Sequence, residues 1–295
     1  MYPSAVQALL CPVCADSFDV PAAGAAALAC RSGHSFDIAK QGYVNLLTGA
    51  GTHFTADTAH MVEARAGFLA AGHYRPLAEA LASVVAGQLS DAQRRPPAGA
   101  GGPRATDVLV DAGTGTGYYL EQIHRRAAVA SVGVDISKYA LRRAARTNPQ
   151  TVNLAWDVWQ PLPLAAGSAV AVVVVFAPRN AAEFARILQP EGFLAVVTPL
   201  PGHLAEIAEA AGLLAQQEHK LEALEGSLEQ FFRLSSSQQL EYRLELGRED
   251  VVRAAMMGPS GHHLDPAVLR NSVAALPETS MVSARFQISV FHKLA

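Results

Sequence analysis

The sequence predicts an α/β fold, in which a doubly wound and mostly parallel sheet follows a small N-terminal module. Two observations carry this prediction. From residue 108 onward, short apolar segments alternate with helical segments, a pattern typical of parallel strands that are buried on both faces. All three cysteines lie within the first 30 residues, in a segment too short to bury a core of its own.

The N-terminal cysteines have the spacing of metal ligands. The sequence contains Cys11-Pro-Val-Cys14 and, after fifteen intervening residues, Cys30-Arg-Ser-Gly-His34. Two short turns that supply sulfur and nitrogen ligands are typical of tetrahedral zinc, whereas a disulfide would leave one cysteine unpaired. Protein fills all four positions, so we expect a structural zinc and look for the chemistry elsewhere.

The sheet elements follow in a regular order. Helices are predicted over residues 57–71 and 75–89, before a linker rich in proline, glycine and arginine at 91–104. Further helices are predicted from Tyr118 and over 138–146, the latter with Ser137 as its N-cap. Predicted strands cover 108–111, 131–135, 151–157, 169–177 and 193–198, and an antiparallel pair at 239–246 and 285–292 is expected to close the sheet edge. The chain thus divides into a zinc module (1–37), connecting helices with the linker (38–104) and the sheet domain (105–295).

A glycine-rich loop follows the first buried strand, as Asp111-Ala-Gly113-Thr-Gly115-Thr-Gly117. Glycines at the carboxyl edge of a sheet let the backbone approach a ligand closely. The loop has no Walker lysine, and its G-x-G-x-G spacing after an acidic residue favours S-adenosylmethionine over a dinucleotide or a nucleoside triphosphate. A tight turn without a ligand is the plain alternative.

Polar residues also end the next strands. Asp135 is placed to accept hydrogen bonds from ribose hydroxyls and Asp157 from an adenine amino group, although each could instead cap a helix. Residues 176–180, Phe-Ala-Pro-Arg-Asn, follow the fourth strand and form either a pocket floor or an ordinary turn.

Composition limits the partners and the location. With a formal net charge of −3, nucleic-acid binding requires a local basic patch. The arginines at 142, 143 and 146, and those at 94, 95 and 104, are solvated by default, with phosphate contact as the alternative. The start lacks a signal peptide, the longest apolar run (169–177) is too short to cross a membrane, and metal-binding cysteines suit a reducing compartment. We therefore expect a cytoplasmic protein.

Several stretches occur together in the order of one known family. They are CPVC and CRSGHSFDIAKQGYVNLL, then DTAHMVEARAGFLAAGHYRPL, VDAGTGTGYYL, GVDISKYALRRAA, FAPRN, VTPLPGHL and MGPSGHH. On these stretches the chain resembles the RlmA family of 23S ribosomal RNA (guanine-N1)-methyltransferases, and most closely its RlmA(II) tylosin-resistance branch. The resemblance covers nearly the whole chain apart from the linker. Its most family-specific part is the cysteine and histidine segment (residues 11–34) followed by GYVNLL.

The resemblance implies a fold, a reaction and a set of site residues. The fold would be a Rossmann-like class I methyltransferase with a seven-stranded sheet. The reaction would move a methyl group from S-adenosylmethionine to guanine N1 in a hairpin loop of domain II of 23S rRNA, near the peptide exit tunnel, and confer resistance to tylosin-type macrolides. The family's zinc ligands match Cys11, Cys14, Cys30 and His34, and its cofactor residues match Tyr74, Gly115, Thr116, Gly117 and His203. Some relatives carry an acid where this chain has Thr116, so the role of that side chain stays open.

Other points are open at this stage. Asp157, Asn180 acting through a water, and direct loss to solvent all remain as routes for the guanine N1 proton. We expect the RNA in a cleft between the zinc module and the catalytic domain, with Arg31, Arg94 and Arg95 as candidate contacts. A small-molecule methyltransferase and a non-enzymatic zinc protein that binds RNA are the competing functions. The sequence is compatible with a homodimer.

Overall fold

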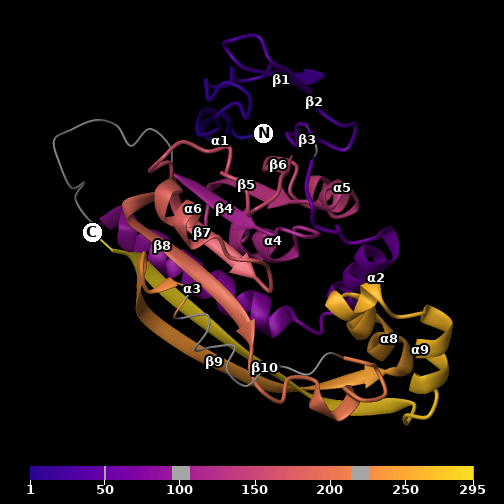
Figure 1. The fold of residues 1–295 in the computed structure, drawn as a ribbon. Helices are drawn as coiled ribbons and strands as arrows, with labels where there is room; N and C mark the ends of the chain where they lie inside the picture. The colour runs from indigo at the N-terminus through magenta and orange to yellow at the C-terminus, as the bar shows by residue number, and fades with distance from the viewer. Residues whose placement is uncertain (50, 95–106, 214–225, 227, 295) are drawn as a thin grey trace.

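A computed structural model describes residues 1–49, 51–94, 107–213, 226 and 228–294 of the chain. The main sheet has eight strands in the order β3-β6-β5-β4-β7-β8-β10-β9 (Figure 1). Neighbouring strands from β3 to β8 are parallel, and β10 is antiparallel to both β8 and β9. The strands are β3 (Tyr43–Asn45), β4 (Val108–Ala112), β5 (Ala130–Asp135), β6 (Val152–Ala155), β7 (Ala169–Val175), β8 (Leu188–Pro199), β9 (Phe232–Gly247) and β10 (Thr279–Lys293).

The strand count corrects the sequence prediction, which gave seven strands. The additional strand, β3, comes from the segment predicted as a connection, and it pairs with β6 through Tyr43 opposite Asn153 and Asn45 opposite Ala155. With only three residues, β3 is too short to show an apolar pattern in the sequence. The antiparallel pair at the other edge is confirmed, and both of its strands are longer than predicted.

The predicted helices are present with shifted ends. They are α2 (Ala59–Ala70), α3 (Arg75–Arg94), α4 (Tyr118–His124) and α5 (Lys138–Thr147), and α6 (Ala181–Ile187) follows β7. Ser137 caps α5 as predicted, since its side chain accepts a hydrogen bond from the backbone N–H of Ala140. Helix α3 continues into the predicted linker, and most of that linker lies outside the described residues.

The two faces of the sheet are covered by different elements. Because side chains alternate along a strand, Leu109 packs with Leu81 of α3 and Leu120 of α4 on one face. Val110 lies on the opposite face, in a hydrophobic cluster that also contains Phe184 of α6 and Leu28 of the N-terminal module. The module therefore shares the hydrophobic core on this face of the sheet.

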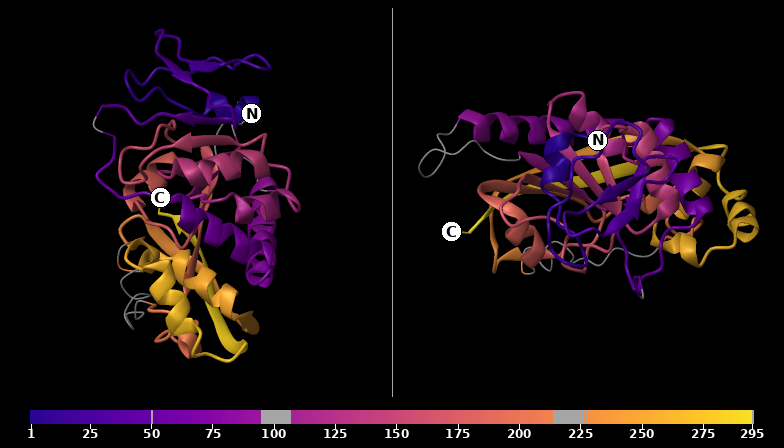
Figure 2. Two further views of the ribbon diagram at one scale, coloured as in Figure 1. Left: turned by 90° about the vertical axis from the view of Figure 1, so that its right-hand side faces the viewer. Right: turned by 90° about the horizontal axis from the view of Figure 1, so that it is seen from above.

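The N-terminal module consists of α1 (Pro3–Gln7) and the hairpin of β1 (Ala27–Ala29) with β2 (Ser35–Asp37). Backbone hydrogen bonds also join it to the sheet domain, from Leu10 N–H to Pro163 O at 3.0 Å and from Ala165 N–H to Ala8 O at 2.9 Å. Figure 2 shows the module at one end of the molecule and the tip of the β9–β10 ribbon at the other.

The ribbon tip carries α8 (Arg248–Met256), a 3₁₀ turn (Pro259–His262) and α9 (Pro266–Val273), and a second 3₁₀ turn (Ala205–Ile207) follows β8. Helix α8 packs closely on α2, since a Cβ atom placed at Gly67 would lie 3.1 Å from Arg253 Nε. Among the described residues, none of the helices combines the length and the hydrophobicity that a membrane crossing requires.

Candidate metal centre and cofactor site

The four predicted metal ligands come together in the N-terminal module. The ligand atoms of Cys11, Cys14, Cys30 and His34 all lie within 4.8 Å of one another. Cys14 Sγ lies 3.8 Å from Cys30 Sγ, which in turn lies 3.5 Å from His34 Nδ1. Ligands about 2.3 Å (sulfur) and about 2.0 Å (nitrogen) from a tetrahedral zinc ion are separated by about 3.8 and 3.5 Å, so the cluster fits zinc as it stands.

Two tight turns bring the ligands together. In the first, the backbone N–H of Cys11 donates to the carbonyl oxygen of Asp16 at 2.8 Å, and Ala15 adopts a left-handed φ of 58°. In the second, Gly33 N–H donates to Cys30 O at 2.9 Å, and the φ of Gly33 is 88°. Each turn closes within a few residues, which explains why the spacing alone predicts the site.

The electrostatics of the turns suit metal binding. The backbone N–H of Asp16 lowers the pKa of the Cys14 thiol to about 7, which favours the thiolate that zinc binds. Burial raises the pKa of the Cys11 thiol, so this ligand depends more on the metal for its ionisation. The Asp16 carboxylate accepts a hydrogen bond from Ser32 Oγ at 3.0 Å and so links the two turns.

The glycine-rich loop lies between β4 and α4, and its three glycines have left-handed φ values of 85°, 55° and 79°. A Cβ atom at Gly113 would lie 2.3 Å from the Cβ of Ala177, and one at Gly117 would lie 2.6 Å from Asn148 Nδ2. A Cβ at Gly115 would meet nothing closer than 3.7 Å. Gly113 and Gly117 therefore fix the packing of the loop, while Gly115 leaves space for a ligand.

Asp135 holds the glycine loop to the end of β5. Its Oδ2 atom accepts from Gly115 N–H at 2.9 Å, and its Oδ1 atom accepts from Ser137 N–H at 2.8 Å. Ser137 caps α5, so the helix-cap alternative for Asp135 is wrong. Each carboxylate oxygen can accept a second hydrogen bond, which leaves acceptors for a ribose.

Asp111 lies inside β4 and is 3% exposed. Burial raises the pKa of its carboxyl to about 7, even though the Thr114 hydroxyl donates to Oδ2 at 2.7 Å and opposes the shift. Near neutral pH this carboxyl is therefore only partly ionised. Thr116 is also buried within the loop.

Asp157 lies two residues beyond β6 and connects two segments. Its Oδ2 atom accepts from the Thr52 hydroxyl at 2.7 Å, and its Oδ1 atom accepts from Trp159 N–H at 2.9 Å. The residue belongs to a turn and caps no helix. The carboxylate thus ties the segment after β3 to the loop after β6, at the carboxyl edge of both strands.

Tyr74, which is buried, and His203, which is half-buried, form a hydrogen-bonded pair. Tyr74 Oη lies 2.9 Å from His203 Nε2, and His203 Nδ1 accepts from the backbone N–H of Arg285 at 3.1 Å. Burial lowers the pKa of His203 to about 4, so the ring is neutral at pH 7. Because Nδ1 accepts, the hydrogen lies on Nε2 and is donated to Tyr74. The Tyr74 hydroxyl hydrogen is therefore available to another acceptor.

Phe176 joins this pair to the glycine loop. Its ring centroid lies 6.2 Å from that of Tyr74 and 6.3 Å from that of Tyr119, and the next residue, Ala177, packs against Gly113. The ring is 44% exposed, and the backbone has a φ of 55°. A left-handed φ is costly for a bulky residue, and such conformations concentrate at functional sites.

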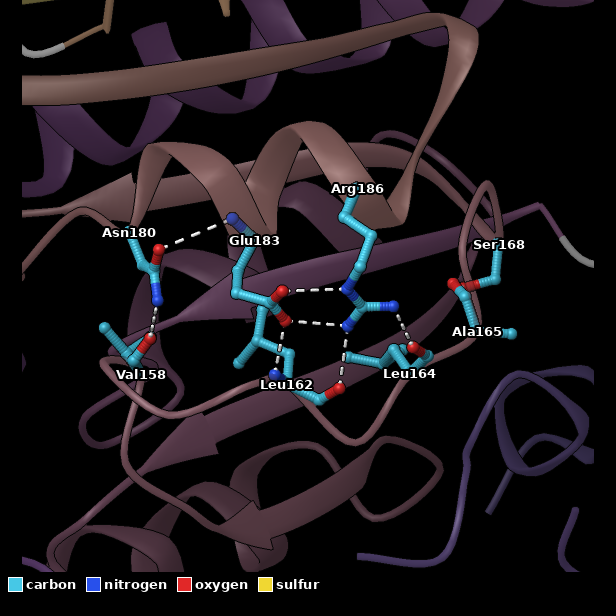
Figure 3. Close-up of polar contacts among 8 residues, drawn as sticks. All are labelled: Val158, Leu162, Leu164, Ala165, Ser168, Asn180, Glu183 and Arg186. Carbon is cyan, nitrogen blue, oxygen red and sulfur yellow. Dashed lines mark hydrogen bonds and ion pairs between the residues drawn. The ribbon is translucent and has the colours of Figure 1, made fainter. Parts of the chain in front are cut away.

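Asn180 has a structural role. Its Oδ1 atom caps α6 by accepting from Glu183 N–H at 3.4 Å, and its Nδ2 atom donates to Val158 O at 3.0 Å (Figure 3). Figure 3 also shows the ion pair of Glu183 with Arg186, which binds the backbone of Leu162 and Leu164. The loops after β6 and β7 are thereby held in one arrangement.

The sequence reasoning missed Arg65. Its Nη1 atom lies 2.5 Å from Asp57 Oδ2, and its Nη2 atom donates to Met257 O at 2.6 Å. A Cβ at Gly115 would lie 3.7 Å from Nη1, and the guanidinium opposes the rise that burial causes in the pKa of Asp135. An arginine on a predicted helix is solvated by default, so only the tertiary structure identifies this one.

Of the three arginines predicted to contact RNA, the two that the structure describes, Arg31 and Arg94, lie on different elements. Arg31 is exposed in the module, 3.9 Å from Asp19. Arg94 is the last residue of α3 and pairs with Asp91 at 2.6 Å. Arg95 and Arg104 lie outside the described residues.

Comparison with known proteins identifies the family. Residues 9–49 match the family described as RlmA, N-terminal, a zinc ribbon, and residues 109–192 match a methyltransferase domain. Over its full length the chain is 43% identical to a putative 23S rRNA (guanine-N(1)-)-methyltransferase of Micromonospora griseorubida, also covered in full. The chain belongs to the RlmA family of 23S rRNA (guanine-N1)-methyltransferases.

Other relatives agree with this assignment. The 23S rRNA (guanine(748)-N(1))-methyltransferase of Streptomyces fradiae is 41% identical over the whole of both chains. A putative methyltransferase structure from Bacillus halodurans has a TM-score of 0.47 at 14% identity, covering 64% of this chain and 94% of that one, a likeness too weak to add to the sheet topology itself. As an RlmA-family enzyme, the protein methylates ribosomal RNA, with S-adenosylmethionine as methyl donor and a structural zinc. Family membership excludes the two competing functions.

Proposed function

We propose that this enzyme methylates N1 of the guanine equivalent to position 748, in a hairpin loop of domain II of 23S rRNA near the peptide exit tunnel. We propose further that the product confers resistance to tylosin-type macrolides. The observation that carries the proposal is the 41% identity, over all of both chains, to the Streptomyces fradiae enzyme that is named for guanine 748. A methyl group on a base beside the drug site would obstruct the drug by its volume.

The cofactor site in this proposal uses the residues at the carboxyl edge of the sheet. Gly115 provides the open approach, and Asp135 accepts from the ribose hydroxyls. Asp157 faces the adenine, and the Tyr74 hydroxyl, oriented by His203, donates to the methionine end of the cofactor. The loop is held in place by the buried side chains of Asp111 and Thr116 and by the close packing of Gly113 and Gly117.

The chemistry requires alignment more than acid–base assistance. S-adenosylmethionine supplies an electrophilic methyl group, so the protein must hold guanine N1 in line with it and exclude water. The target base must leave its stack to reach the site, which an unpaired hairpin loop makes cheap. In this proposal Asp157 faces the adenine, and both polar atoms of the Asn180 side chain bind the backbone of neighbouring loops. We therefore propose that the N1 proton passes to solvent.

The zinc module has a recognition role in this proposal. We keep the division into residues 1–37, 38–104 and 105–295, with the first part as the module that positions the RNA. Its hairpin lies at one end of the sheet, beyond the edge strand β3 (Figure 1). A module fixed by a shared core can present RNA at a defined distance from the cofactor.

A methylation assay tests the proposal. The enzyme is incubated with methyl-labelled S-adenosylmethionine and either naked 23S rRNA or an rRNA in which guanine 748 is replaced by adenine. We expect one N1-methylguanine in the first RNA, located by mass mapping, and none in the second. Labelling at another guanine would overturn the position. Unchanged tylosin sensitivity of a strain that carries the modification would overturn the resistance role.

A further inference from the structure

Exposed aromatic side chains are concentrated in one region of the molecule. In the described ranges, four aromatic side chains are exposed: Phe54 (53%), Trp159 (49%), Tyr139 (48%) and Phe176 (44%). The other phenylalanine, tyrosine and tryptophan side chains are buried or half-buried. Large apolar rings kept in water are a marker of binding surfaces.

These four rings lie along one edge of the sheet. Phe54 follows β3, Tyr139 follows β5, Trp159 follows β6 and Phe176 follows β7. Because β3, β6, β5, β4 and β7 are neighbouring parallel strands, their carboxyl ends meet at the same edge. The glycine loop after β4 lies at that edge too, so the rings surround the cofactor site.

Phe54 and Trp159 are held as a pair. Their ring centroids are 6.5 Å apart with an interplanar angle of 32°. The Asp157 carboxylate accepts from Trp159 N–H and from the Thr52 hydroxyl, and that hydroxyl accepts from Phe54 N–H at 3.2 Å. One carboxylate therefore positions the backbone under both rings.

Positive charge accompanies the aromatic edge. Helix α5, which begins beside Tyr139, carries a lysine and three arginines and no acidic residue. The guanidinium of Arg142 lies over the Tyr139 ring, 5.3 Å from its centroid. Arg179, three residues after Phe176, is half-buried, has no ion pair within the part of the chain that the structure describes, and has a pKa lowered by burial. On α5, Arg143 is paired with Glu63 of α2. Arg142, Arg146 and Arg179 therefore supply the local positive charge that complements phosphate groups in a chain of net charge −3.

We propose that Phe54 and Trp159 stack on unpaired nucleotides that flank the target guanine, with Tyr139 and Phe176 continuing this surface and the arginines of α5 contacting the RNA backbone. The proposal rests on the proposed function, because it takes the unpaired loop of an RNA hairpin as the occupant. Unpaired RNA bases are recognised by stacking on aromatic rings, and alternating rings and cations suit a strand whose bases and phosphates alternate. The surface would then set where the loop lies when its guanine reaches the methyl group.

Binding measurements on matched variants test the surface. Phe54→Ala and Trp159→Ala are compared with Trp159→Phe, which keeps a ring, and with Val268→Ala, which truncates a more exposed apolar side chain (63%) on α9. The ligands are a 23S rRNA hairpin transcript and, separately, S-adenosylhomocysteine. We expect the two alanine variants at positions 54 and 159 to bind the RNA about 5- to 150-fold more weakly, the equivalent of about 1–3 kcal/mol per base, with unchanged S-adenosylhomocysteine affinity. Trp159→Phe and Val268→Ala should bind both ligands like the wild type.

Tryptophan fluorescence adds a direct reading. Trp159 is exposed and the other tryptophan, Trp156, is 6% exposed, so stacking on a base should quench the emission of the wild type and leave that of Trp159→Phe unchanged. An equal loss of S-adenosylhomocysteine affinity would assign the rings to the cofactor adenine and overturn the inference. Normal RNA binding by both alanine variants would overturn it as well. If the wild type methylates the rRNA in that case, the proposed function stands and only the stacking surface is wrong. A wild type that does not methylate the rRNA overturns the proposed function, and the assignment of this surface to RNA with it.

Discussion

The metal centre and the proposed cofactor site, which we call the cofactor edge because it lies at the carboxyl ends of the parallel strands, are built on opposite principles. The zinc ligands all come from residues 11–34, and two short turns place them. The cofactor edge takes residues from positions as distant as Tyr74 and His203, which are 129 residues apart and meet only when the sheet is complete. A site of the first kind can be recognised from spacing, whereas one of the second kind depends on the whole fold.

The two regions also differ in how their polar groups are used. In the metal centre, protein ligands fill a tetrahedron, and nothing is left open for a substrate. At the cofactor edge, several groups keep a free donor or acceptor after their internal bonds are counted, such as the Tyr74 hydroxyl and the Asp135 carboxylate. We therefore expect the first region to contribute stability and propose that the second binds the ligands.

The largest expected effect is at the metal centre. Cys30→Ser should abolish stoichiometric zinc binding, since structural zinc contributes roughly 10–16 kcal/mol of apparent binding free energy in small modules. From the sequence alone we expect the loss to loosen only the first forty residues. Leu9 and Leu28 share the core of Val110, however, so we now expect the melting temperature of the whole chain to fall.

Val13→Ser is the control for this variant, because Val13 lies between the zinc ligands Cys11 and Cys14 in the other turn and its side chain is 55% exposed. It should retain one zinc per chain by elemental analysis. If Cys30→Ser loses its zinc and still melts at the wild-type temperature, the shared core does not couple the two regions.

The glycine loop offers the next largest effect. Gly113→Ala should destabilise the protein by about 2–5 kcal/mol, because its Cβ would overlap Ala177 and an alanine resists the left-handed conformation. Gly115→Ala should cost only about 1–2 kcal/mol, the conformational part, and should weaken S-adenosylhomocysteine binding more than it weakens the fold. Urea unfolding and calorimetry separate the two quantities. Equal stability losses would remove the distinction between a packing glycine and a ligand glycine.

Because the carboxyl of Asp111 is buried, we expect its titration to change the free energy of unfolding by up to about 4 kcal/mol. This figure follows from a pKa raised by about 3 at about 1.36 kcal/mol for each pKa unit. Its pKa is raised to about 7 in the folded protein. Between pH 4 and 7 the folded state keeps a proton that the unfolded state has released, so this group lowers the free energy of unfolding as pH rises. The stability advantage of Asp111→Asn over the wild type should therefore grow from pH 4 to 7 and level off above.

Denaturant unfolding across this pH range checks the prediction. Thr114→Val removes the hydrogen bond that lowers the pKa of Asp111. In this background the stability advantage of Asp111→Asn should therefore continue to grow to a higher pH. A pH-independent difference between the wild type and Asp111→Asn would show that the carboxyl does not titrate there.

The last prediction concerns ligand affinity at Asp135. Asp135→Ala should weaken S-adenosylhomocysteine binding by about 1.5–3 kcal/mol, or about 10- to 150-fold, because hydrogen bonds to a charged acceptor are lost. Asp135→Asn keeps an oxygen that can accept from Gly115 N–H and should lose less affinity. Calorimetry that gives equal affinities for the alanine variant and the wild type would exclude Asp135 from the ribose site.

The comparison of the two regions also explains which parts the sequence could predict. The alternation of apolar strands, the Ser137 cap and the zinc spacing are local signals, and the structure confirms them. Strand β3 was missed because three residues carry no periodicity, and Arg65 was missed because its partners Asp57 and Met257 lie on separate segments. The pairing of Tyr74 with His203 had no local signal, and only the family resemblance indicated both residues.

The position of β10 has a consequence for how the enzyme is made. This strand is the last along the sequence, yet it lies between β8 and β9, and its Arg285 amide orients His203. During synthesis β8 keeps an open edge and β9 has no partner in the sheet until residues 279–293 have left the ribosome. A chain that terminates before residue 279 would therefore carry an aggregation-prone edge. It would also lack the Arg285 amide that orients His203 towards the Tyr74 hydroxyl. The hydrogen bond that orients His203 towards Tyr74 thus forms only after residues 279–293 have joined the sheet.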